Sequence, residues 1–211
     1  MKTKIFSIKL NSFLFILSLS MFISCKVHKI SDESKEWQPY KKKDILIFKS
    51  SKGEFDTIWI KKVSFETAVT DHLSFNPDRY QTLSVTGKIS LQRPYPLQRG
   101  LPIRRTFIHM LTIYASDPDY ISLDFTKRLD TLRYSPTRVS IDELSKLEVE
   151  SPNFKYNSFE IKSESSPKNP NLIYLTKYWW SKEYGYVRYE FSNGYYWELQ
   201  QFIRDGKNIL P

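Results

Sequence analysis

The side chains that could perform acid–base, nucleophilic or metal chemistry are few and widely spaced in this sequence. Three histidines, His28, His72 and His109, stand far from one another, and Cys25 is the one cysteine. Zinc sites use closely spaced histidine and cysteine ligands, and no such spacing occurs here. The sequence also has no glycine-rich phosphate loop and no Gly-x-Ser-x-Gly turn. We therefore predict no metal site, no cofactor and no catalytic residue.

The N-terminal stretch predicts export. Lys2, Lys4 and Lys9 precede an apolar run at residues 13–23, and Cys25 follows the small Ser24. A charged segment before a short apolar run is typical of a secretory signal peptide. The run is too short to cross roughly 30 Å of hydrocarbon as a helix, which takes about 20 residues. We therefore expect residues 1–24 to be a signal peptide that is removed.

Cys25, at the end of this signal, resembles the lipidated cysteine of bacterial lipoproteins of the Bacteroidota type. Their usual box has a leucine and then two small residues, whereas Phe22-Ile23-Ser24 keeps only the small residue next to Cys25. The resemblance implies lipid attachment at Cys25, with palmitate-type acyl chains, in an outer membrane lipoprotein that faces the periplasm or the cell surface. Two or more acyl chains anchor a protein stably. The alternative is an ordinary secreted or inner-membrane protein with an unpaired thiol.

The rest of the chain divides into a tether and one domain. Residues 25–43 are polar, with Ser31-Asp32-Glu33-Ser34 and Lys41-Lys42-Lys43, and predict a flexible lipid-attached tether. Its acidic cluster resembles surface-export signals of such lipoproteins. Residues 44–211 suffice for one domain and are short for two. With 40% hydrophobic residues and 16% aromatics the chain can bury a core, which excludes a disordered protein.

Strand patterns dominate the predicted domain. Runs rich in β-branched and aromatic residues, bounded by turn residues, predict strands at 44–50, 54–60, 80–91, 107–114, 120–125, 172–180, 186–191 and 195–199. Ser51-Lys52-Gly53 predicts a hairpin turn of two or three residues. Three prolines between residues 93 and 102 prevent ladder bonding and predict an irregular loop. We predict a mainly β fold: an antiparallel curved sheet, as a sandwich or an open barrel-like meander, with at most one or two short helices.

One helix has a clear start signal. Ser140-Ile141-Asp142-Glu143 has the spacing of a capping box and precedes Leu144 and Leu147. Asp117-Pro118-Asp119 predicts a turn between two strands, with too few carboxylates for a calcium site.

The C-terminal hairpin allows a prediction of register. A two-residue Asn193-Gly194 turn would place Tyr189 opposite Glu198 and mix core with charge. A three-residue loop, with Gly194 left-handed, instead groups Tyr189 with the apolar side chains and sets Arg188 opposite Glu198 on the other face. Burial of Glu198 would cost several kcal/mol, so we predict the three-residue loop.

Two candidate binding surfaces follow from charge and from aromatic content. The chain carries a net charge of +9, and no Asp or Glu occurs between Arg79 and Ser116. The first candidate binds an anionic envelope component or a protein partner, and it comprises Lys88, Arg93, Tyr95, Arg99, Arg104 and Arg105. The second candidate would stack against a sugar or peptide, and it comprises Tyr178, Trp180, Tyr184, Tyr186 and Tyr196. A solvated loop and a packed aromatic core are the respective alternatives.

The predicted function is a membrane-tethered lipoprotein whose β-rich domain binds a partner or supports the cell envelope without catalysis. The stretch from Lys177 to Leu199 resembles the ends of uncharacterised small β-rich lipoproteins, a resemblance that implies no activity. Nucleic acid is excluded as a partner because an exported protein rarely meets it. The alternative is an envelope hydrolase, built from His109, Asp117 and a serine, or a small-ligand carrier.

Overall fold

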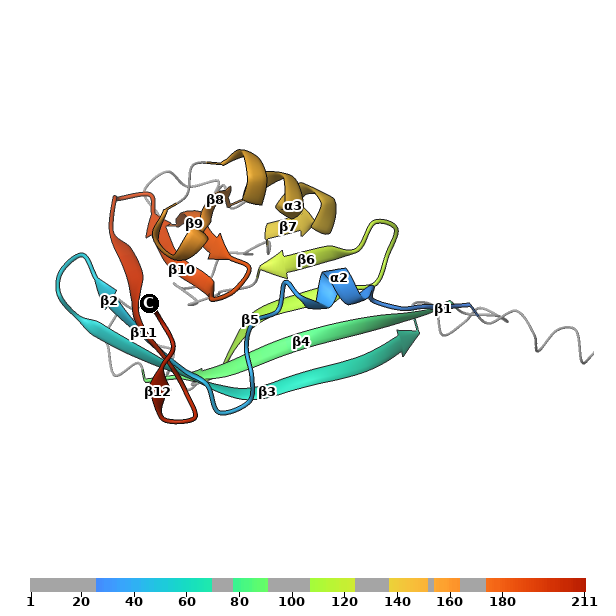
Figure 1. Cartoon of the computed structure of the whole chain (residues 1–211), viewed down its shortest axis with the longest axis horizontal. Helices are drawn as coiled ribbons and strands as arrows, with labels where there is room; N and C mark the ends of the chain where they lie inside the picture. The colour runs from blue at the N-terminus through green and yellow to red at the C-terminus, as the bar shows by residue number, and fades with distance from the viewer. Residues whose placement is uncertain (1–25, 70–77, 91–106, 124–136, 152–153, 164–173) are drawn as a thin grey trace, which may run out of the picture.

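The computed structural model describes residues 26–69, 78–90, 107–123, 137–151, 154–163 and 174–211. Their core is one antiparallel sheet that curves into a nearly closed barrel (Figure 1). The barrel strands are β2 (Ile45–Ser50), β3 (Phe55–Val69), β4 (Arg79–Ile89), β5 (Phe107–Tyr114), β6 (Tyr120–Leu123), β7 (Thr137–Ser140), β8 (Phe159–Lys162), β9 (Leu175–Ser181), β10 (Gly185–Phe191) and β11 (Tyr196–Arg204). This confirms the predicted mainly β class and, of its two forms, the barrel-like meander.

The barrel closes because its last long strand pairs with its first. The chain runs from β2 to β7 and from β8 to β11 with each strand beside the next, and β11 then pairs antiparallel with β2. The remaining opening lies between β7 and β8, and helix α3 (Ile141–Glu150) connects these two strands in sequence. The hydroxyl groups of Thr137 and Ser163, which lie 3.5 Å apart, face each other across this opening.

Two short strands pair with the ends of interior strands of the sheet. β1 (Val27–His28) pairs in parallel with the start of β4, and β12 (Lys207–Asn208) folds back on β11. A four-residue helix, α2 (Asp32–Lys35), and a short 3₁₀ turn at Lys155–Asn157 complete the described elements. Among the residues that the structure describes, neither α-helix is long and apolar enough to cross a membrane.

The barrel interior is aromatic because alternate residues of each strand face it. The largest fully buried side chains include Trp180, Trp197, Tyr178, Tyr189 and Phe48. Their rings contact one another: Phe48 of β2 and Tyr189 of β10 have centroids 5.5 Å apart in an edge-on arrangement. Such pairs contribute roughly 0.5–1.5 kcal/mol beyond the burial of their area.

The predicted turn chemistry is confirmed in both hairpins. Gly194 has φ +77°, its N–H donates to Phe191 O at 2.9 Å, and Arg188 lies opposite Glu198. Gly53 has φ +84° and closes a three-residue turn in the first hairpin, the choice that the sequence left open. The predicted cap of α3 is also present, since Ser140 Oγ accepts a hydrogen bond of 3.1 Å from Glu143 N–H.

The prediction of a flexible tether over residues 25–43 is wrong from residue 26 onward, because Lys26 and β1 are already hydrogen-bonded to β4. Ile30, Trp37 and Tyr40 are buried, with at most 2% of each exposed. Trp37 packs edge-on against Phe159 of β8, and Tyr40 contacts Trp180 and Phe202. The charged residues between them face solvent. The average composition of the segment is therefore polar, although three widely spaced residues belong to the core.

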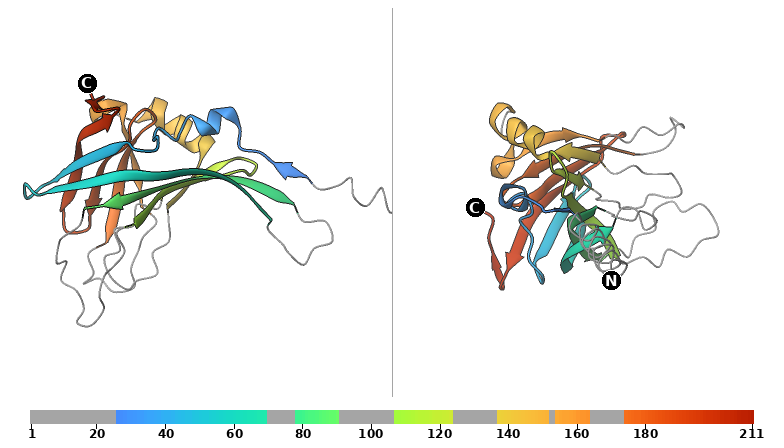
Figure 2. Two further views of the ribbon diagram at one scale, coloured as in Figure 1. Left: turned by 90° about the horizontal axis from the view of Figure 1, so that it is seen from below. Right: turned by 90° about the vertical axis from the view of Figure 1, so that its right-hand side faces the viewer.

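This N-terminal segment and the helices cover one end of the barrel (Figure 2). α2 is held there by Asp119, which accepts hydrogen bonds from Ser31 N–H at 2.9 Å and Ser34 Oγ at 2.7 Å. The opposite end carries the β2–β3 and β10–β11 turns. The two ends of the barrel are therefore built differently, one from packed helical segments and one from strand connections.

Candidate binding face

The predicted aromatic surface is wrong for four of its five residues. Tyr178, Trp180 and Tyr186 are fully buried and Tyr184 is 8% exposed, so they belong to the core. Tyr186 reaches across the barrel, where its hydroxyl donates to Met110 O at 2.8 Å. These side chains are inside because Tyr178 lies directly opposite the inward-facing Tyr189, and Trp180 opposite Tyr186. Tyr196 alone faces outward.

The predicted anion-binding surface lies mostly outside the described residues. Arg93, Tyr95, Arg99, Arg104 and Arg105 all fall in the connection between β4 and β5 at residues 91–106. Lys88 is described: it is exposed near the end of β4 and pairs with Trp59 of β3. The histidine set is not brought together: His109 lies five residues, or roughly 17 Å of strand, before β5 ends at Tyr114, and Asp117 lies in the turn beyond that end.

A different group of side chains gathers on the outside of β8–β11. Strand alternation places these residues on the face opposite the core, and pairing brings Arg188 beside Trp179 and Glu198, and Glu190 beside Tyr196. We name this group the outer-face cluster. It comprises Lys155, Glu160, Lys177, Trp179, Arg188, Glu190, Tyr196 and Glu198.

Arg188 is the centre of the outer-face cluster. Its guanidinium carbon lies 3.7 Å from the ring centroid of Tyr196 and 4.9 Å from that of Trp179. The same guanidinium donates to Glu190 at 3.0 Å and lies 3.8 Å from Glu198. A planar guanidinium can stack on rings and pair with carboxylates at once, which an ammonium cannot do.

The carboxylates of the cluster are held by cations. Glu198, only 13% exposed, contacts both Arg188 and Lys155, and the hydrogen bond with Glu198 raises the pKa of Lys155. Glu160 lies 3.5 Å from Lys177, whose ammonium group lies 5.0 Å from the ring of Trp179. Paired carboxylates of this kind fix the geometry of the face.

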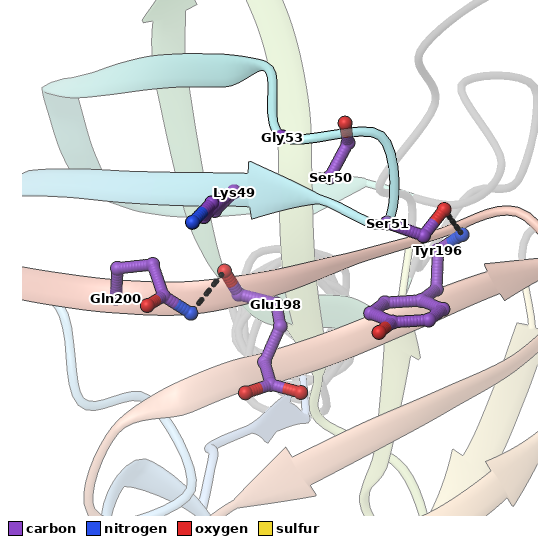
Figure 3. A pocket seen from close by; sticks show the side chains of 7 residues that line it. All are labelled: Lys49, Ser50, Ser51, Gly53, Tyr196, Glu198 and Gln200. Atoms are coloured by element: carbon purple, nitrogen blue, oxygen red, sulfur yellow. Dashed lines mark hydrogen bonds between the residues drawn. The ribbon is translucent and has the colours of Figure 1, made fainter.

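A shallow depression adjoins the cluster on β2 and β11 (Figure 3). It has a volume of about 340 Å³ and is lined by Lys49, Ser50, Ser51, Gly53, Tyr196, Glu198 and Gln200. The turn between β2 and β3 forms one wall, because Ser51 N–H donates to Tyr196 O at 2.9 Å. The lining offers hydroxyl, amide, ammonium and carboxylate groups beside one aromatic ring.

Within the described ranges, no three His, Cys, Asp or Glu side chains lie together as metal ligands would. No protein-family model, curated protein or solved structure matches this chain. The case for the outer-face cluster as a binding site therefore rests on its geometry alone. The sequence placed Arg188 opposite Glu198 but did not reveal Trp179 or Tyr196 as its partners, although strand alternation in β9 and β11 was the signal that could have done so.

Proposed function

We propose that this protein is a lipid-anchored envelope protein, acylated at Cys25, whose barrel domain binds a ligand without catalysis. The ligand site is the outer-face cluster with its adjoining depression. The anchor is supported by the signal pattern that ends at Cys25. The binding role is supported by the arrangement around Arg188, where two rings and two carboxylates converge on one guanidinium.

The chemistry of this face fits a glycan of the cell envelope. A sugar presents hydroxyl groups around a flat, weakly apolar ring, and it is recognised by an aromatic side chain next to polar groups that orient it. Tyr196 supplies such a ring, and Ser51, Gln200 and Lys49 supply donors and acceptors around it. The charges in the cluster are nearly balanced, which suits an uncharged or weakly charged polar ligand better than a polyanion.

Retention on envelope material tests this proposal. The purified protein is passed over immobilised envelope polysaccharide and, separately, over immobilised envelope protein extract. We expect retention on polysaccharide, lost in Tyr196→Ala and reduced in Gln200→Ala. Tyr120→Ala is the matched control, because Arg138 lies 5.6 Å from the Tyr120 ring in a similar cation–ring contact on β6 and β7.

Retention by protein extract alone would replace the glycan with a protein partner. Equal retention of Tyr196→Ala and Tyr120→Ala would remove the outer-face cluster as the binding site. Acylation is measured independently, by incorporation of labelled fatty acid into the parent and not into Cys25→Ala, and an unlabelled parent would overturn the anchor.

A further inference from the structure

The chain enters the fold immediately after Cys25. Arg79 N–H donates to Lys26 O at 3.1 Å, and Val27 and His28 pair with Arg79 and Tyr80. Lys26, the residue that follows Cys25, is therefore already hydrogen-bonded to the sheet. Because consecutive α-carbons are 3.8 Å apart, Cys25 is held within that distance of Lys26. No spacer separates the proposed acylation site from β1.

The segment after β1 is fixed at each step. The His28 ring stacks on Tyr80 with centroids 4.4 Å apart, Ile30 N–H donates to Gln81 Oε1 at 3.2 Å, and Ser31 N–H donates to Asp119. The direction in which the chain leaves the fold toward Cys25 is therefore set by the sheet.

From this geometry we propose that the far end of the β3–β4 ribbon rests directly on an anionic bilayer surface, with the barrel held away from it. The proposal rests on the acylation of Cys25 that is proposed above. We call this region the ribbon tip and define it as residues 26–29, 65–69 and 78–80. Figures 1 and 2 show that β1 and the adjoining ends of β3 and β4 project away from the barrel.

The surface of the ribbon tip matches lipid headgroups. Lys26, Lys29 and Arg79 are exposed there; of the two carboxylates in the tip, Asp78 lies 3.8 Å from His28 Nε2 and Glu66 pairs with Lys62 at 3.1 Å. Val27 is a large apolar side chain that is 41% exposed. Phe65, nearer the barrel, is 49% exposed, with Lys35 Nζ 5.9 Å from its ring centroid. Cations attract anionic headgroups, and exposed apolar side chains beside them can enter the interfacial layer.

The first experiment measures charge. Protein that begins at position 25 and carries Cys25→Ser is mixed with vesicles of neutral lipid or of neutral and anionic lipid in a 3:1 ratio, at low salt. The triple variant Lys26→Ser, Lys29→Ser, Arg79→Ser should bind the anionic vesicles on the order of a hundredfold more weakly, about fivefold for each charge. The control, Lys41→Ser, Lys42→Ser, Lys52→Ser, removes the same charge from exposed sites elsewhere and should change binding little.

The second experiment measures contact. The protein is coupled through the thiol of Cys25 to a maleimide lipid in anionic vesicles, and a photo-cross-linking residue replaces the exposed Thr67 or the exposed Lys207. We expect lipid cross-links from position 67 and none from position 207. Equal cross-linking at the two positions, or equal loss of binding in the two triple variants, would overturn the proposal.

Failure of the proposed anchor is a separate result. Mass spectrometry of the N-terminal peptide tests the anchor: we expect acylation of Cys25 in the native protein, and an unmodified thiol there would overturn it. The first experiment removes the acylation site with Cys25→Ser, and the second supplies a lipid through maleimide coupling. Neither outcome depends on native acylation, so both test only whether the ribbon tip contacts the membrane.

Discussion

Arg204 of the last long strand donates two hydrogen bonds to the carboxylate of Asp44, from Nε at 3.0 Å and from Nη2 at 2.6 Å. The same guanidinium donates to Pro39 O at 2.7 Å. Asp44 is 2% exposed and also accepts from Lys41 N–H. One arginine thus joins the N-terminal segment, the start of β2 and the end of β11 at the point where the barrel closes.

The loss of this arginine should be costly. Arg204→Met leaves the Asp44 carboxylate buried without its charge partner, so we expect the free energy of unfolding in urea to fall by about 3–5 kcal/mol. Lys35→Met, which removes the exposed pair with Asp32, is the control and should leave stability almost unchanged. A double variant Asp44→Asn, Arg204→Met should recover part of the loss, and equal losses in single and double variants would contradict this role.

Two glycines with the same backbone conformation should respond differently to substitution. Gly185 has φ +73°, and a Cβ there would lie 2.0 Å from Tyr40 Oη, whereas Gly194 has φ +77° and open space around it. Gly194→Ala should cost about 1 kcal/mol of strain, and Gly194→Val somewhat more. Gly185→Ala should cost more than about 3 kcal/mol, because the core must also move. Similar melting temperatures for the two alanine variants would refute the packing of Tyr40 against β10.

Acid should release α2. Burial raises the pKa of Asp119, but hydrogen bonds from Ser34 Oγ and from the backbone of Ser31 and Ser116 outweigh it and lower the pKa below the ordinary value. A depressed folded pKa gives stability that is present above the unfolded pKa of about 3.9 and is lost as the pH falls through the folded value. Asp119→Asn should therefore be less stable than the parent at pH 7, with a difference that shrinks below about pH 4 in urea titrations. Ser34→Ala should shift the acid transition to higher pH, and an unshifted transition would argue against this bond.

The ring contacts of Arg188 should matter as much as its charge. Arg188→Lys keeps the charge but removes the flat group that stacks on Tyr196 and Trp179. We expect a loss of about 1–2 kcal/mol in stability and weaker retention on polysaccharide. Arg138→Lys, at the more distant 5.6 Å contact with Tyr120, is the control and should change both readouts less. If the two lysine variants behave alike, the cluster has no special organisation.

The local signals of the sequence predicted the structure well. Ser140 and Glu143 predicted the start of α3, and Asn193-Gly194 with its flanking residues predicted a register that is present in β10 and β11. These features depend on neighbours within a few residues, where propensity and alternation act.

The failures came from pairing that the sequence does not encode locally. A bulge between Tyr186 and Arg188 lets both Tyr186 and Tyr189 face the core, although simple alternation puts them on opposite faces. Without knowledge of that bulge, the sequence left both an outward surface and a packed core open for Tyr178, Trp180 and Tyr186. The burial of Trp37 likewise depends on Phe159, more than a hundred residues away in the sequence. No residue near Trp37 in the sequence predicts that contact.

The length of β3 has a consequence for reach. This strand begins at Phe55, beside the turn that walls the depression, and ends at Val69 in the ribbon tip. The fourteen residue-to-residue intervals of about 3.3 Å make β3 a stiff strand up to roughly 45 Å long. A disordered linker of 19 residues, the length of the segment from 25 to 43, would have a mean span of only about 24 Å and would let the domain tumble. If the ribbon tip rests on a membrane as proposed, β3 would hold the depression at a set distance from the lipid.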